Sequence, residues 1–201
     1  SFRRAEPVLD GNVYGAGTRS FSGAVTNNGT IDVATGTTAA FNAFVTGAGD
    51  FTGGGTSGFN GGFSPGNSPA AVDVAGDAVF GSSNTLLMEL AGLLPGTEHD
   101  VLTIQGYAFL GGLLDIDLLG GFNPVAGDSF DLLFAEVMHG SFASTLLPGL
   151  NAGLVWNLQY LLNPTGTDTL RLSVEAQVVP VPAAAWLFGP ALLLVGALRR
   201  R

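Results

Sequence analysis

Two aspartates in one short stretch are the residues best placed to do chemistry. Residues 114–118 read Leu-Asp-Ile-Asp-Leu, so an extended chain would hold the carboxylates of Asp115 and Asp117 on one face, about 7 Å apart. Paired carboxylates can act as acid and base in a glycosidase, and they can also contact calcium. The same alternation is that of a strand with one face in solvent, and we expect this simpler arrangement.

A histidine between two acids is the second candidate. His99 lies between Glu98 and Asp100, a set that could form part of a metal site or of a catalytic triad. No second ligand lies at a usable spacing, and the chain has no cysteine, which excludes thiolate metal sites and thiol nucleophiles. We therefore expect His99 in a solvated turn, and we expect no metal ion, no cofactor and no enzymatic activity.

Two aromatic residues could offer a platform for sugars. Trp156 and Tyr160 lie in an alternating stretch that also holds Asn157 and Gln159. The period of two favours a strand whose aromatic side chains anchor it to the core, rather than an exposed platform.

The distribution of charge excludes one class of partner. The formal net charge is -9 at pH 7, the chain has no lysine, and no arginine lies between Arg19 and Arg171. An acidic surface repels phosphate backbones, so we expect no nucleic-acid partner. A solvated acidic surface is the simplest interpretation, with binding of calcium or of a cationic polymer as the alternatives.

Short strands must position these residues. With hydrophobic residues at 46% and charged residues at 11%, the chain does not have the composition of a disordered protein. Residues 1–62 are rich in Gly and Thr, and their spacing is too irregular to define a repeat, although it resembles degenerate solenoid rungs. Residues 63–175 hold longer strand candidates separated by turn signals, with no helical period. The sequence therefore predicts an all-β body. Its candidate strands are 30–33, 43–46, 50–52, 86–90, 101–104, 114–118, 130–134, 154–160 and 170–175.

The C-terminal residues break this pattern. Residues 176–182 form a proline-rich linker, in which Pro180 and Pro182 keep the backbone extended. Residues 183–198 carry no charge and would be about 24 Å long as a helix, close to the hydrocarbon core of about 30 Å. We predict one transmembrane helix within 183–201, with the terminal arginines on the cytoplasmic side. The residues of this anchor are Ala183, Trp186, Leu187, Phe188, Leu192, Leu193, Leu194, Val195, Leu198, Arg199, Arg200 and Arg201.

The tail resembles the PEP-CTERM sorting signal of exported bacterial proteins, which combines a Pro-x-Pro motif, an apolar helix and a terminal arginine cluster. The motif here is Val179, Pro180, Val181 and Pro182, with Val181 where the name-giving motif has glutamate. The resemblance implies that the tail holds the protein in the inner membrane of a Gram-negative bacterium until exosortase processes it near this motif. It also implies an association with exopolysaccharide and the biofilm matrix.

The body resembles autotransporter passengers and related β-helical surface proteins over residues 63–174. The segments that carry the resemblance are 63–69, 99–106, 111–116 and 127–133. The resemblance implies a right-handed β-solenoid, or a β-sandwich capped by a solenoid.

These features together predict an exported structural protein of the cell surface or the extracellular matrix. The chain starts at Ser1 without an apolar leader, so we expect that a signal peptide or a longer N-terminal part has been removed. The expected partners are exosortase, the inner membrane and an extracellular polysaccharide. The alternatives are a glycan-binding or glycan-active β-helix protein, and a calcium-binding adhesin.

Overall fold

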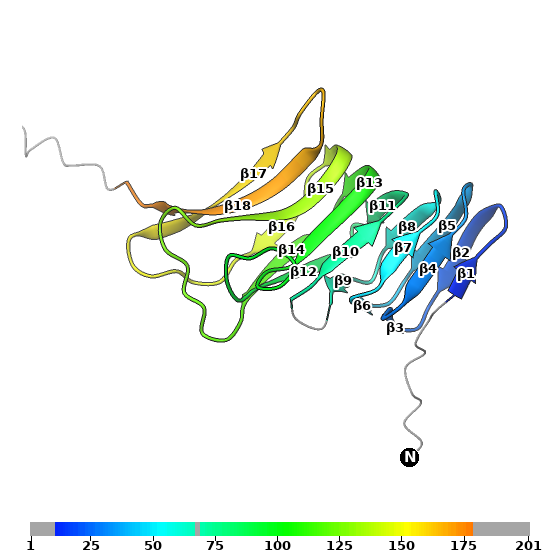
Figure 1. Cartoon of the computed structure of the whole chain (residues 1–201), viewed down its shortest axis with the longest axis horizontal. Helices are drawn as coiled ribbons and strands as arrows, with labels where there is room; N and C mark the ends of the chain where they lie inside the picture. The colour runs from blue at the N-terminus through cyan, green and yellow to red at the C-terminus, as the bar shows by residue number, and fades with distance from the viewer. Residues whose placement is uncertain (1–10, 67–68, 179–201) are drawn as a thin grey trace, which may run out of the picture.

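The computed structural model describes residues 11–66 and 69–178, and every helix or strand within them is a β-strand (Figure 1). The all-β prediction is therefore confirmed for this part of the chain. No helix among the described residues is long and apolar enough to cross a membrane. The processing motif at 179–182 and the transmembrane helix predicted within 183–201 lie outside the described residues.

Most strands belong to three parallel ladders. The first ladder consists of β1 (Gly11–Val13), β4 (Thr30–Val33), β7 (Asp50–Thr52), β10 (Ala71–Val74) and β13 (Val101–Leu110). The second consists of β2 (Gly17–Phe21), β5 (Thr37–Phe41), β8 (Thr56–Phe59) and β11 (Asp77–Phe80), and it also ends on the long strand β13. The third consists of β3 (Val25–Thr26), β6 (Val45–Gly47), β9 (Phe63–Pro65), β12 (Thr85–Leu90), β14 (Leu113–Leu118) and β16 (Ser144–Leu146).

In each ladder, a strand pairs with the strand that follows it after one full turn of the chain. The chain therefore winds as a coil, and we call residues 11–146 the coil. Gly11 pairs with Ile31, and Ile31 pairs with Phe51, which makes a turn of 20 residues, the separation of the hydrogen-bonded Thr52 and Asp32. Nearer the C-terminus the turn grows to 30 residues. The turn is not constant, since Phe41 pairs with Phe59, 18 residues away, and this variation is why the sequence alone defines no repeat.

A column of phenylalanines occupies the interior of the coil along the second ladder. The register places Phe41 next to Phe21, Phe59 next to Phe41, and Phe80 next to Phe59. The ring centroids of these pairs lie 5.1, 5.7 and 5.6 Å apart, with nearly parallel rings. Each buried phenylalanine contributes about 1.5–3 kcal/mol by removing apolar surface from water, and each aromatic contact adds about 0.5–1.5 kcal/mol. We call these four residues the phenylalanine column.

Glycines allow successive turns to approach closely at the corners. At Gly47, φ is 112°, and a Cβ atom there would collide with the backbone of Asn27 in the previous turn. At Gly76, a Cβ atom would collide with the carbonyl oxygen of Gly55. Side chains at these corners would therefore force the turns apart and break the ladder spacing of about 4.8 Å.

The C-terminal end of the coil is covered by antiparallel strands. β15 (Ser129–Gly140) pairs in parallel with β13, while its other edge pairs antiparallel with β18 (Asp168–Ala176), which in turn pairs with β17 (Leu154–Leu161). In Figure 1 these strands lie at the end opposite to β1 and β2. One hydrophobic core extends from Val13 to Val174. It crosses the predicted boundary at 62/63, where β9 pairs with β6 on one side and with β12 on the other.

We expect Phe59→Ala to lower the free energy of unfolding by about 3–5 kcal/mol, because it opens a cavity in the middle of the phenylalanine column. The measurement is urea unfolding followed by circular dichroism. Phe44→Ala is the matched control, since Phe44 is 38% exposed, and it should cost less than about 1 kcal/mol. Equal losses for the two variants would show that the column does not stabilise the coil.

Candidate functional site

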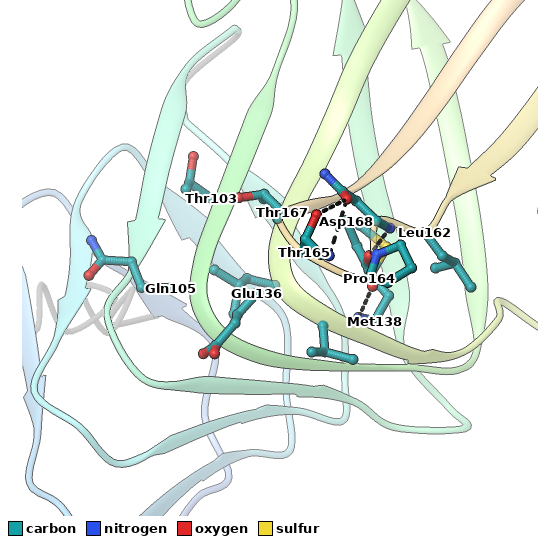
Figure 2. A pocket seen from close by; sticks show the side chains of 13 residues that line it. Thr103, Gln105, Glu136, Met138, Leu162, Pro164, Thr165, Thr167 and Asp168 are labelled. Carbon is teal, nitrogen blue, oxygen red and sulfur yellow. Dashed lines mark hydrogen bonds between the residues drawn. The ribbon is translucent and has the colours of Figure 1, made fainter.

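A groove lies on the outer surface of the protein near the covered end of the coil. Its floor is formed by outward-facing side chains of β13 and β15, and its wall is formed by the loop between β17 and β18 (Figure 2). The volume of the groove is about 780 Å³, within the usual range for a ligand site. The residues that line the groove include Thr103, Gln105, Glu136, Val137, Leu162 and Pro164.

The groove exists because the pairing of β15 changes along its length. The antiparallel pairing of β15 with β18 ends at the pair Ala135–Asp168. Beyond this point β15 continues with β13 alone as far as Gly140, and the chain before Asp168 turns away from the edge of β15. The space between that departing loop and the sheet is the groove.

A buried carboxylate fastens the wall of the groove to its floor. Asp168 is 5% exposed, and its Oδ2 accepts a hydrogen bond of 2.7 Å from the backbone N–H of Met138 on β15. Its Oδ1 accepts a second bond of 2.7 Å from the backbone N–H of Asn163 in the loop. The side chain of Asn163 in turn accepts from the N–H of Thr165 at 3.3 Å, which closes a local Asx turn. The loop is therefore held in one conformation next to β15.

The groove is acidic, and none of the described residues that line it carries a positive charge. Glu136 is exposed on the floor. Of the two arginines in the described part of the chain, neither lines the groove. Arg171 is paired with Asp131, with Nε 2.5 Å from Oδ1 and Nη2 2.8 Å from Oδ2, and this pairing raises the pKa of Arg171. An anionic ligand would therefore meet repulsion in the groove without a compensating charge.

Three exposed rings extend the floor of the groove along the same two strands. Tyr107 is 44% exposed and Phe109 is 41% exposed, and His139 on β15 is also exposed. The ring of His139 stacks on that of Phe109 with centroids 5.0 Å apart and approaches that of Tyr107 at 5.8 Å. Tyr107 pairs with Val137, which lines the groove. We call Tyr107, Phe109 and His139 the aromatic strip.

A local bulge in β13 lies between its groove-lining residues and the aromatic strip. The register of β13 shifts between Ile104 and Tyr107, where Gly106 leaves room for the neighbouring turn. The carboxylate of Asp77 on β11 accepts a hydrogen bond of 2.9 Å from the N–H of Tyr107. This bond lies at the other edge of β13, between the residues that pair with β10 and those that pair with β11.

The paired aspartates lie elsewhere, on the third ladder. In β14, Leu114 and Ile116 are buried, Asp115 is partly buried and Asp117 is exposed, which confirms the expected solvated face. Partial burial raises the pKa of Asp115, and the neighbouring charge of Asp117 raises it further. The groove is formed by β13 and β15, so these carboxylates do not contribute to it.

The expectation of a solvated turn at His99 is wrong. His99 is 2% exposed, and Asp100 is fully buried. The carboxylate of Asp100 accepts hydrogen bonds from the N–H of Ala70 at 2.7 Å and of Glu89 at 2.8 Å, so it joins two neighbouring strand ends. The ring of His99 packs edge-on against Phe130 at 5.4 Å. These two residues hold the body together rather than line a site, and no group of three metal-ligating side chains occurs within the described residues.

The aromatic residues singled out in the sequence are anchors, as expected. Trp156 and Tyr160 pack against the hydrophobic core. The indole N–H of Trp156 donates to the carbonyl oxygen of Pro148 at 2.8 Å, and the hydroxyl oxygen of Tyr160 accepts from the N–H of Phe142 at 3.3 Å. The exposed rings are those of the aromatic strip, which sequence reasoning missed. Residues 107–109, read Tyr-Ala-Phe, contain the signal, a small residue between two aromatics on a strand.

No protein-family model matches this chain, and no curated protein matches it either.

We expect the titration of Asp100 to make the protein less stable as the pH rises. Burial raises the pKa of this carboxyl to about 7, although its bonds from Glu89 and Ala70 oppose the shift. The unfolded chain loses this proton near pH 4, so the folded state binds it more tightly, and the associated stability is lost between about pH 4 and 7. The measurement is thermal unfolding of Asp100→Asn and of the unaltered protein at a series of pH values. The two proteins share all other titrating groups, His99 included, so the difference between them reports on Asp100.

The difference in free energy of unfolding between the unaltered protein and Asp100→Asn should change by up to about 4 kcal/mol over this range. Asp117→Asn, at an exposed site, is the control and should give a difference that is nearly constant with pH. Parallel curves for Asp100→Asn and the unaltered protein would contradict the assignment.

We expect Asp168→Ala to release the wall of the groove. The substitution leaves the buried N–H groups of Met138 and Asn163 without an acceptor, at a cost of about 1–3 kcal/mol each. Hydrogen exchange should become at least tenfold faster at these two amides. Asp128→Ala is the control, since Asp128 accepts one bond from the N–H of Val125 at an exposed turn. Unchanged exchange at Met138 and Asn163 would rule out the clamp.

Proposed function

We propose that this chain is an exported, non-enzymatic structural protein of the bacterial cell surface or extracellular matrix, and that its groove mediates contact with the surroundings. The observation that carries the proposal is the combination of a continuously hydrogen-bonded coil with an open groove on its outer surface. A coil of this kind is rigid, and its surface rather than an enclosed pocket is available to partners. The outer surface of the coil is acidic, which agrees with contact between this surface and solvent outside the cell.

We propose further that the coil is a right-handed β-solenoid, with the antiparallel strands β15, β17 and β18 as its cap. The parallel pairing of each turn with the next supports this. A solenoid must cover the end of its core to avoid open strand edges. The antiparallel pairing of β15 with β18 provides such a cover at one end.

The C-terminal sorting signal is the third part of the proposal. Its support is the sequence pattern alone: prolines at 180 and 182, the uncharged stretch 183–198 and three terminal arginines. Such a segment would hold the protein at the inner membrane, with the arginines on the cytoplasmic side. Extended prolines at the membrane surface would leave the backbone accessible to exosortase.

Cell fractionation tests localisation. The chain, fused to an export signal, is expressed in cells with and without exosortase, beside a version ending at residue 182. We expect the full chain to be in the membrane fraction without exosortase, the shortened version to be soluble, and intact mass to show loss of the tail when exosortase is present. Leu193→Asp is a matched point variant, because a charge within the apolar stretch costs about 2.5–3.5 kcal/mol in insertion. Equal membrane retention of the full and shortened chains would refute the anchor.

A further inference from the structure

We propose that the groove and the aromatic strip together form one binding track for a neutral glycan chain, meaning a sugar polymer without carboxylate or sulfate groups. The inference rests on the proposed function in one respect, that the coil meets such polymers outside the cell. It adds the site, the chemical class of the ligand and the residues that recognise it.

The track follows an extended strand. Thr103, Gln105, Tyr107 and Phe109 of β13 all face outward, since the residues between them are buried or small. This side-chain row is about 20 Å long at the rise of an extended strand. Glu136, Val137 and His139 of β15 accompany it on the neighbouring strand. The surface is therefore elongated along two neighbouring strands, which suits a linear polymer better than a compact ligand.

The aromatic strip offers the kind of surface on which sugar rings pack. The rings of Tyr107 and Phe109 are about two-fifths exposed, although a strand on the outside of a soluble coil normally carries polar side chains there. Sugar rings have one face lined with C–H groups, which packs on an aromatic ring while the hydroxyls at its rim remain available for hydrogen bonds. Aromatic surfaces combined with a few polar groups are typical of ligand sites.

Polar side chains with unused hydrogen-bonding capacity lie beside the rings. The side chains of Gln105 and Glu136 make no hydrogen bond within the described part of the protein, and both line the groove. Figure 2 shows them together on the floor, across from Pro164 and Thr165 of the wall. An amide can donate and accept, and a carboxylate accepts from hydroxyls. The groove thus complements the hydroxyls of a sugar.

The charge of the groove favours neutral over acidic glycans. Glu136 lies on the floor, and neither of the described arginines lines the groove. A uronic acid or sulfated chain would place its anions near Glu136 without a cation to pair with them. A neutral chain avoids this repulsion.

An extended peptide added to the edge of β15 is a poorer occupant. Strand addition needs a row of free backbone groups. At this edge the N–H of Met138 is already bonded to Asp168, and the loop from Leu162 to Thr167 lies alongside. The side chains, rather than the backbone, are what β13 and β15 offer to a ligand.

Isothermal titration of the full chain tests the inference, in a zwitterionic detergent that has no sugar headgroup. The probes are cellohexaose, maltohexaose and hexagalacturonate, which are neutral and extended, neutral and curved, and acidic. We expect binding of cellohexaose, weaker or equal binding of maltohexaose, and at least tenfold weaker binding of hexagalacturonate. Failure of both neutral probes to bind at millimolar concentration, or preferred binding of hexagalacturonate, would overturn the proposal.

Variants locate the site. Phe109→Ala and Gln105→Ala should each weaken binding of cellohexaose at least fivefold, while Tyr14→Ala, which removes a ring that is 60% exposed between β1 and β2, should leave it unchanged. Circular dichroism of each variant confirms its fold. Equal affinity of Phe109→Ala and Tyr14→Ala for cellohexaose would place the glycan elsewhere and overturn the proposal.

A charge reversal gives a gain of binding that a misfolded variant cannot imitate. Glu136→Arg should bind hexagalacturonate at least tenfold more tightly than the unaltered protein does, and no such gain would contradict the role of Glu136. These titrations use purified protein, so they are independent of cell fractionation. A failed titration with a membrane-anchored protein refutes the glycan track alone, whereas a soluble full chain that binds cellohexaose refutes the anchor alone.

Discussion

In-register stacking of one turn of the coil on the next is the constraint on which the rest of this structure depends. The column formed by Phe21, Phe41, Phe59 and Phe80 requires each turn to return the same side chain to the same place. Parallel ladders satisfy the backbone, and the column removes apolar surface from water at every step. Because a slip by one residue would expose every inward side chain, the register of the whole coil is strongly determined by a few residues per turn.

The groove follows from the way this regular stacking ends. β15 must continue the coil along one edge and accept an antiparallel strand along the other, and the two pairings stop at different residues. The length of β15 beyond Ala135 is therefore left with one neighbour, and Asp168 fixes the departing loop beside it. The same region of β13 holds the bulge between Ile104 and Tyr107. The candidate site therefore forms where the stacked turns end, whereas the body consists of the stacked turns themselves.

Local patterns predicted the strands with a clear signal, such as 114–118, since alternation and turn signals act within a few residues, but they missed the second ladder of β2, β5, β8 and β11. Local patterns failed where residues far apart in the sequence determine the structure. The period of 20 residues was missed because the turns between inward positions differ in sequence. His99 was misplaced because the neighbouring acids suggested solvent, whereas Phe130 and the strand ends joined by Asp100 bury it. The groove joins β13, β15 and a loop near residue 165, and no short window of sequence contains all three.

The change in turn length from 20 to 30 residues has a consequence for how such a body diversifies. A turn contacts only the turns before and after it, so extra residues can leave the stack at a corner and return without disturbing the ladders. The longer turns near β13 therefore carry surface loops, and the shorter turns near β1 do not. Duplication of a short turn would lengthen the coil by about 4.8 Å. It would move the groove farther from β1 without changing the residues that line the groove.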